Sequence, residues 1–336
     1  MSEHEFDDLD ELELDRRDLF VKGGLLAAGA ALLGSPVAAA APAAAPAATR
    51  FRYAVITHGA GDAFWAVVKK GVQRAAKDLG MSVTYSESFN KPQRQAQLID
   101  TAVSRKPAGI AVSAPNPDAL KDSLARAARA KIPIVTLNSG VDKFKQLRAF
   151  THVGQTETIA GRGAGERFRT AGAKNLLVVI HEQGNIGLEQ RYSGARAGLK
   201  GGKTSRLQVA GVADVARTTN EIRTKLTTDK SIDAVLALNP QVGIAARDAA
   251  KGARSDAKIA TFDLSGDVIS AIQKGEMLFA VDQQQYMQGY LPVVFLYLNS
   301  INANIAGGGQ PILTGPGFVD KSNAAKVAAL AKRGTR

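Results

Sequence analysis

The chain has 336 residues, which suits two domains, and its hydrophobic content of 45% is ordinary for a globular protein with a sizeable core. It contains no cysteine, which excludes disulfides, thiolate metal sites, a cysteine nucleophile and a lipid-anchoring cysteine. The net charge is +12, but the basic residues are scattered singly over polar helix faces, as at Lys69, Lys70, Arg74 and Lys77. We therefore interpret the charge as a solvated basic surface and expect no nucleic-acid partner.

Residues 1–48 differ in composition from the rest of the chain. They carry nine acidic and three basic side chains, so the remainder has a net charge of +18. The stretch DRRDLFVK at residues 15–22 resembles the twin-arginine export motif, and a weakly apolar run and an Ala/Pro tract follow it. We predict a twin-arginine signal peptide and linker over residues 1–48, with cleavage within residues 38–48. Because acidic residues are unusual in a signal, a disordered cytosolic tail is the alternative.

From residue 51 onward, segments with strand and helix patterns alternate. The expected strands cover residues 51–58, 81–86, 108–113, 132–137, 175–181, 207–212, 234–238, 258–262, 278–281 and 317–319, with a short apolar piece at 149–153. The expected helices cover residues 63–79, 94–104, 118–130, 157–170, 188–199, 219–226, 242–250, 268–274, 286–301 and 322–332, and residues 306–314 are expected to form a loop. This alternation predicts an α/β fold with parallel sheets, in two Rossmann-like lobes rather than one sheet.

Polar and aromatic side chains gather where the expected strands end. In open α/β sheets, ligands bind beyond the carboxyl ends of the strands. The candidates for a ligand site are His58, Asp62, Phe64, Trp65, Ser113, Asn116, Asn138, Arg191, Asn239, Asp263, Asp282 and Gln283. Amides and carboxylates pair with hydroxyl groups, and aromatic rings stack on the C–H faces of sugars, so the set is typical of a carbohydrate site. Asp62, Asn116, Asn239 and Asp263 directly precede helices and could also serve only as helix caps.

No motif indicates catalysis. The turn Gly59-Ala60-Gly61 supplies two glycines of a dinucleotide fingerprint, but Phe64 stands where the third would allow close helix–strand packing. A nicotinamide-dependent oxidoreductase, with Glu87 as the ribose acceptor, is therefore a weak alternative. The histidines form no HxxxH or HExxH pair, and GxSxG and GxxxxGK[ST] motifs are absent. We expect no enzyme activity, no cofactor and no metal.

Several segments, taken in order, resemble the periplasmic solute-binding proteins of the ribose/galactose class, which are relatives of the effector domains of lac-repressor-type regulators. They include HGAGDAFWAVVKKG, QLIDTAVSRKPAGIAVSAPNPDAL, IPIVTLNSG, LEQRYSGARAGL and FDLSGDVISAIQKGEMLFAVDQQQYMQGYLPVVFL, and the resemblance covers nearly all of residues 51–321. It implies the type 1 fold of this class, with two lobes joined by three crossovers near residues 150–154, 282–284 and 315–320. The first lobe would comprise residues 50–151 and 283–315, and the second residues 152–282 and 316–336.

The resemblance also implies which lobe carries each candidate residue of the ligand site. Asp62, Phe64, Trp65, Ser113 and Asn138 would face the ligand from the first lobe. From the second lobe, Arg191, Asn239 and Asp263 would face them, and Gln283 would lie at the hinge.

Two departures from the family bear on the ligand. Asn138-Ser139 replaces a frequent Asp-Arg pair, and Val215 stands where ribose binders place a second aromatic residue. A less polar, modified or charged polyol is expected rather than plain ribose or galactose, and the basic chain makes an acidic sugar a candidate.

The function implied by the resemblance is that of the solute-binding component of an ABC importer. A monomer in the periplasm would close around a sugar or polyol and deliver it to a membrane permease. An exported sensing module for a receptor kinase would look the same from the sequence. A transcription-factor effector domain is disfavoured, because residues 1–48 resemble an export signal rather than a helix-turn-helix.

Overall fold

The computed structural model describes residues 51–336, so the signal peptide and linker predicted over residues 1–48 lie outside the described residues. Within the described part of the chain, no helix is both long enough and apolar enough to cross a membrane.

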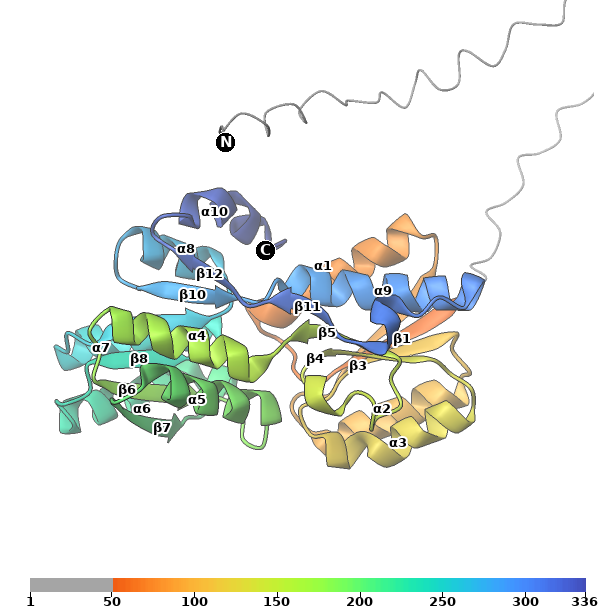
Figure 1. The fold of residues 1–336 in the computed structure, drawn as a ribbon, viewed down its shortest axis with the longest axis horizontal. Helices are drawn as coiled ribbons and strands as arrows, with labels where there is room; N and C mark the ends of the chain where they lie inside the picture. The colour runs from red at the N-terminus through yellow and green to blue at the C-terminus, as the bar shows by residue number, and fades with distance from the viewer. Residues whose placement is uncertain (1–50) are drawn as a thin grey trace, which may run out of the picture. The chain divides into compact units, whose positions relative to one another are not determined.

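The first lobe is built on a six-stranded sheet with the order β11-β5-β4-β3-β1-β2, and all of its strand pairs are parallel. Figure 1 shows helices on both faces of this sheet. The strands of this lobe are β1 (Arg52–Thr57), β2 (Ser82–Glu87), β3 (Gly109–Ser113), β4 (Ile134–Asn138), β5 (Thr151–Gln155) and β11 (Ile312–Gly315). Its helices are α1 (Ala63–Asp78), α2 (Pro92–Ser104), α3 (Pro117–Arg129) and α9 (Gln285–Asn302).

The second lobe repeats this plan with the strand order β12-β10-β9-β8-β6-β7, in which only β12 runs antiparallel. Its strands are β6 (Asn175–Ile180), β7 (Lys203–Gln208), β8 (Ala234–Ala237), β9 (Lys258–Phe262), β10 (Phe279–Asp282) and β12 (Gly317–Asp320). Its helices are α4 (Glu157–Thr170), α5 (Ile186–Leu199), α6 (Val215–Thr228), α7 (Pro240–Ala253), α8 (Gly266–Gln273) and α10 (Ala324–Arg333). The prediction of an α/β fold with two lobes of largely parallel sheets is confirmed.

The central strands are buried on both faces, with mostly apolar side chains in β3 and β4 and several polar ones in β5. All residues of β3, β4 and β5 are buried, as expected for parallel strands that helices cover on both sides. Glycines let some of these helices approach closely. A methyl group at Gly194 of α5 would overlap the backbone of α4, and one at Gly289 of α9 would overlap the backbone of α1.

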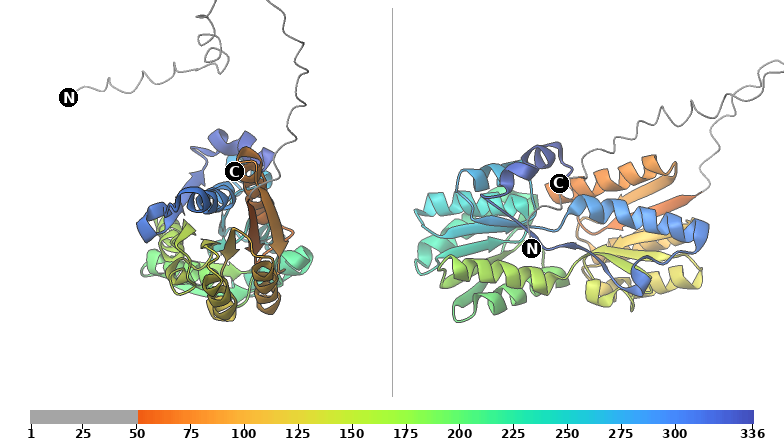
Figure 2. Two further views of the ribbon diagram at one scale, coloured as in Figure 1. Left: turned by 90° about the vertical axis from the view of Figure 1, so that its right-hand side faces the viewer. Right: turned by 45° about the horizontal axis from the view of Figure 1, so that its top comes forward.

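Three segments cross between the lobes next to one another (Figures 1 and 2). They run from β5 to α4, from β10 to α9 and from β11 to β12. The third segment lies between the other two, because Gly315 pairs with Gln155 at the end of β5 and Gly317 pairs with Asp282 at the end of β10. The expected lobe boundary at residue 151 is too early, since Thr151–Gln155 is a strand of the first sheet.

Two expected segments are wrong, and both lie at sheet edges. Residues 306–314 are expected to form a loop, but Ile312–Gly315 forms β11, which is held by pairing with β5. The strand expected at residues 207–212 lies earlier in the chain, as β7, Lys203–Gln208. This strand ends its sheet and is largely accessible to solvent, so its sequence, KTSRLQ, can be polar. Local hydrophobic patterns are weak in such strands.

Candidate functional site

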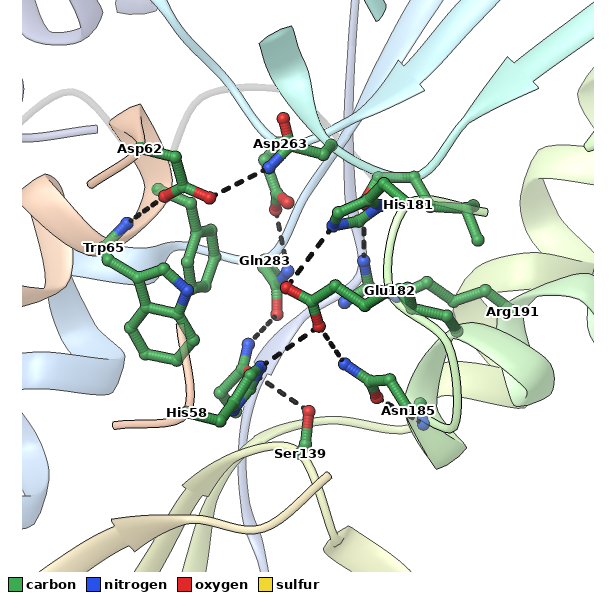
Figure 3. Close-up of a pocket in the computed structure, with 16 residues that line it drawn as sticks. His58, Asp62, Trp65, Ser139, His181, Glu182, Asn185, Arg191, Asp263 and Gln283 are labelled. Carbon is green, nitrogen blue, oxygen red and sulfur yellow. Dashed lines mark hydrogen bonds and ion pairs between the residues drawn. The ribbon is translucent and has the colours of Figure 1, made fainter. Parts of the chain in front are cut away.

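A polar cavity lies between the two lobes, where the carboxyl ends of strands from both sheets face each other (Figure 3). It contains about 360 Å³ of space free of protein atoms, part of which is open to solvent. Its lining residues are His58, Asp62, Phe64, Trp65, Asn138, Ser139, His181, Glu182, Asn185, Gly187, Leu188, Arg191, Leu238, Asn239, Asp263 and Gln283.

The aromatic side of the cavity is set by the turn between β1 and α1. Asp62 caps α1 and accepts a hydrogen bond from the backbone N–H of Trp65 at 2.9 Å. The rings of Phe64 and Trp65 meet edge to face with centroids 4.9 Å apart, and His58 contacts Trp65 in the same way at 4.8 Å. A side chain at Gly59 would overlap the indole, so glycine is required there. The aromatic wall is therefore held in place by its own loop.

The same contacts leave little room for a dinucleotide. In a dinucleotide-binding lobe, the pyrophosphate lies at the N-terminus of the first helix and close to the glycine turn. Here the indole of Trp65 lies against Gly59, and the carboxylate of Asp62 already accepts from the N-terminus of α1. A phosphate would meet both a bulky ring and a negative charge.

A hydrogen-bonded chain connects the two lobes at the hinge. Asn138, at the end of β4, donates to the amide oxygens of Gln283 at 3.3 Å and Gln288 at 3.2 Å. Gln283 in turn donates to Asp263, at the end of β9, at 2.7 Å. All four side chains are buried, so their hydrogen bonds have little competition from water.

Arg191 brings a positive charge to the cavity, but Glu157 of α4 neutralises it. The guanidinium donates to the two carboxylate oxygens of Glu157 at 2.6 and 3.0 Å, and it also lies 4.3 Å from the ring centroid of Phe262. Side-chain exposure is 6% for Arg191 and 1% for Glu157. This bidentate pair leaves the cavity without a free guanidinium among the described residues.

Glu182 lies between three neighbouring side chains of the cavity wall. Its carboxylate accepts from the amide of Asn185 at 2.6 Å and lies 3.5 Å from Nε2 of His58 and 3.7 Å from Nε2 of His181. Burial alone would raise the pKa of Glu182, but the hydrogen bond and charge of His58 outweigh it and hold this pKa below its usual range. Burial lowers the pKa of His181 to about 4, so this imidazole is neutral at pH 7.

The other two carboxylates are shifted in the opposite direction. Burial raises the pKa of Asp62 to about 6 and that of Asp263 to about 7. The hydrogen bond from Trp65 to Asp62, and the charge of Arg191 near Asp263, offset only part of this effect. Both groups lack a full counter-charge, so a hydroxyl donor would stabilise their ionised forms.

The lobes are in contact across the cavity. The amide of Asn239 in the second lobe donates to Asp62 in the first at 3.2 Å. The backbone N–H of Ile186 donates to the carbonyl of Pro115, also across the cleft, at 3.1 Å. The structure is therefore a closed arrangement of the two lobes.

Most of the sequence candidates line this cavity, namely His58, Asp62, Phe64, Trp65, Asn138, Arg191, Asn239, Asp263 and Gln283. Three others do not. Ser113 lies behind His58 and contacts its Nδ1 at 2.8 Å, and Asn116 lines a neighbouring space. Asp282 faces away, toward Arg336, whose Nε donates to it at 2.8 Å.

The helix-cap alternative holds for some candidates and not for others. Asp62 and Asn239 cap α1 and α7 and line the cavity as well. Asn116 makes no side-chain cap bond, and Ser265 rather than Asp263 caps α8.

Seven lining residues were not among the candidates from the sequence, namely Ser139, His181, Glu182, Asn185, Gly187, Leu188 and Leu238. His181, Glu182 and Asn185 follow β6 directly, so the rule that ligands bind beyond strand ends could have found them. Across residues 51–336, no group of three or more His, Asp or Glu side chains is placed to hold a metal ion.

Comparison with known proteins agrees with this architecture. Residues 53–300 match the periplasmic binding protein domain. The crystal structure of a carbohydrate transporter from Acidothermus cellulolyticus 11B, in complex with myo-inositol, is 41% identical with a TM-score of 0.83, and the match covers 85% of this chain and 99% of that one. The ribose import binding protein RbsB of Haemophilus influenzae is 26% identical over 69% of this chain and 79% of its own length. The D-allose-binding periplasmic protein of Escherichia coli is 27% identical over 69% of this chain and 78% of its own length. The domain match, which spans most of the chain, shows that this protein belongs to the periplasmic binding protein family.

Proposed function

We propose that this protein is the solute-binding component of an ABC importer and that it holds a neutral cyclic polyol of the inositol type between its lobes. The observation that carries the proposal is the interlobe cavity, with Phe64 and Trp65 on one side and carboxylates and amides around the rest. Such a lining suits a ring whose C–H face packs on aromatic side chains and whose edge carries hydroxyl groups. The relative solved with myo-inositol supports this choice of ring.

The charges of the cavity favour a neutral ligand over an acidic one. Asp62, Glu182 and Asp263 contribute carboxylates, and the charge of Arg191 is taken up by Glu157. A ligand carboxylate would face this negative lining without a free cation to pair with. A hydroxyl group, in contrast, can donate to a carboxylate in a charge-assisted bond worth about 1.5–3 kcal/mol. The cavity thus argues against the acidic sugar suggested by the basic composition.

The mechanism follows from the position of these groups in two lobes. Ligand binding shifts the balance from an open to a closed form only if the closed form offers more contacts. Trp65 would contact the ligand from the first lobe and Asp263 from the second, so the full set of contacts requires closure. In our proposal, a permease recognises the closed form on the periplasmic side of the membrane. The relatives described as import and transport proteins support this step.

A thermal-shift screen of the purified full chain tests the proposal. The panel contains myo-inositol, D-ribose, D-allose, glucuronic acid and NAD. At 100 times the dissociation constant, a ligand adds about 2.7 kcal/mol of stability, which raises the melting temperature by several degrees. We expect a dose-dependent shift with myo-inositol. A shift with glucuronic acid or NAD alone would contradict the proposal.

A further inference from the structure

The segment that follows α10 brings a positive charge to the hinge. Helix α10 ends at Arg333, and Gly334 follows it with a left-handed backbone, φ +66°. Figures 1 and 2 show this end of the chain between α10 and α1. Here Nε and Nη2 of Arg336 each lie 2.8 Å from Oδ2 of Asp282, in the crossover from β10 to α9. Its Nη1 donates to the amide oxygen of Gln284 at 3.2 Å.

The two partners of Arg336 stand on either side of Gln283, which lines the ligand cavity. The other carboxylate oxygen of Asp282 accepts from the backbone N–H of Gln284 at 2.8 Å. This bond helps to hold Gln284 in a left-handed conformation, φ +55°, which residues other than glycine adopt uncommonly. The amide of Gln284 also donates to the carbonyl of Thr314 in β11 at 2.8 Å. The backbone is therefore fixed on both sides of Gln283.

Gln283 has one hydrogen-bond donor left for a ligand. Its amide oxygen accepts from Asn138 at 3.3 Å and from Gln288 at 2.9 Å. Its amide nitrogen donates to Asp263 at 2.7 Å (Figure 3). The second N–H of this nitrogen has no partner among the described residues. Because the side chain is buried and its other positions are occupied, the direction of this N–H depends on how the backbone of Gln283 is held.

The ion pair of Arg336 and Asp282 is unequal in its exposure to water. The side chain of Asp282 is 1% exposed and that of Arg336 is 33% exposed, and no other cation in the described part of the chain pairs with this carboxylate. Loss of Arg336 would leave a buried negative charge without a partner, which is strongly unfavourable. This charge would also act on Asp263, because burial first and the charge of Asp282 to a smaller extent raise the pKa of that residue. Loss of the carboxylate, in contrast, would leave a guanidinium that water can reach.

We infer that Arg336 is a positioning residue for ligand binding. It keeps the carboxylate of Asp282 in place, and through it the backbone that directs the free N–H of Gln283 at the ligand. Arg336 does not line the cavity, so it acts on affinity without touching the ligand. The inference rests on the proposed function, because it assigns the ligand to the cavity between the lobes.

Isothermal titration calorimetry of the full chain with myo-inositol tests the inference. Arg336→Gln should weaken binding about threefold to thirtyfold, which is the range expected for a residue that acts on a site through a chain of contacts. Arg333→Gln is the matched control, because it makes the same change in the same segment. The side chain of Arg333 is exposed and has no hydrogen bond or ion pair within residues 51–336. This control should change the dissociation constant less than about twofold.

A second background tests whether Arg336 acts through Asp282. Asp282→Asn removes the buried charge but keeps an oxygen that can accept from the backbone N–H of Gln284. This variant should weaken binding less than about threefold, because water can hydrate the guanidinium of Arg336. In the Asp282→Asn background, Arg336→Gln should change the dissociation constant less than about twofold. A residue that only stabilised the fold would produce the same loss in both backgrounds.

The outcomes separate this inference from the proposed function. If the wild type and Arg336→Gln bind myo-inositol equally well, Arg336 does not position the site and the proposed function stands. Equal losses in the two backgrounds, or a loss in Arg333→Gln as large as that in Arg336→Gln, would likewise overturn the inference. If the wild type does not bind myo-inositol, the proposed function fails, and the inference fails with it.

Discussion

Asp263 should make the stability of the ligand-free protein depend on pH. It follows β9, is 3% exposed, and accepts one hydrogen bond from Gln283 at 2.7 Å. Burial raises its pKa from 3.8 to about 7. The native state therefore keeps a proton that the unfolded chain releases at lower pH, and stability falls as pH rises through this window. With a native pKa near 7, linkage gives a loss of about 2.6 kcal/mol between pH 5 and pH 8.

The substitution Asp263→Asn removes this titration with little change in shape. The backbone at this position has φ +69°, which asparagine tolerates as well as aspartate, and the amide oxygen can still accept from Gln283. Urea unfolding at pH 5, 6, 7 and 8 measures the effect. The fall in unfolding free energy from pH 5 to pH 8 should be about 2.6 kcal/mol smaller in the variant than in the wild type. The variant should also be the more stable protein at pH 8.

Asp256→Asn is the matched control, since Asp256 is exposed in the loop that leads into β9. This control should keep the pH dependence of the wild type. Equal pH dependence in the wild type and Asp263→Asn would show that Asp263 is already ionised in the folded protein. Burial would then not be enough to keep this carboxyl group protonated near neutral pH.

Three further predictions concern the cavity wall and the helix packing. Trp65 is the only tryptophan in the chain, so ligand binding should change the intrinsic fluorescence. Trp65→Phe should abolish this signal and weaken binding about fivefold in calorimetry, because a smaller ring stacks on the ligand. Glu157→Gln leaves Arg191 without its buried counter-charge and should lower the unfolding free energy by about 3 kcal/mol, measured by urea titration. An unchanged urea midpoint would show that the pair is not buried in the folded protein. Gly194→Ala should cost about 1–3 kcal/mol in the same assay, because the added methyl group overlaps the backbone of α4. Gly252→Ala is its control: a methyl group there faces only a flexible side chain, so this helix should become slightly more stable.

The alternation of elements could be predicted because the buried strands are short apolar runs and the helices have a regular apolar face. Helix α4 and strand β9 begin and end where the sequence indicates. Strand β7 was expected four residues too late in the chain, and β11 was expected to be a loop. Each lies at the edge of its sheet, where side chains are half solvated and pairing with one neighbour decides the conformation.

That polar and aromatic side chains meet at the carboxyl ends of the strands could be inferred from the amino-acid sequence alone. This follows because parallel strands direct their carboxyl ends to the same side, whatever the details of packing. Which charged side chains pair with one another, in contrast, is visible only in the folded protein. Glu157 neutralises Arg191 from 34 positions away, and Glu182 meets His58 from the opposite lobe. The first pair depends on the packing of α4 against α5 within the second lobe, and the second pair depends on lobe closure. No local pattern along the chain records either arrangement, or the loss of water around the paired groups.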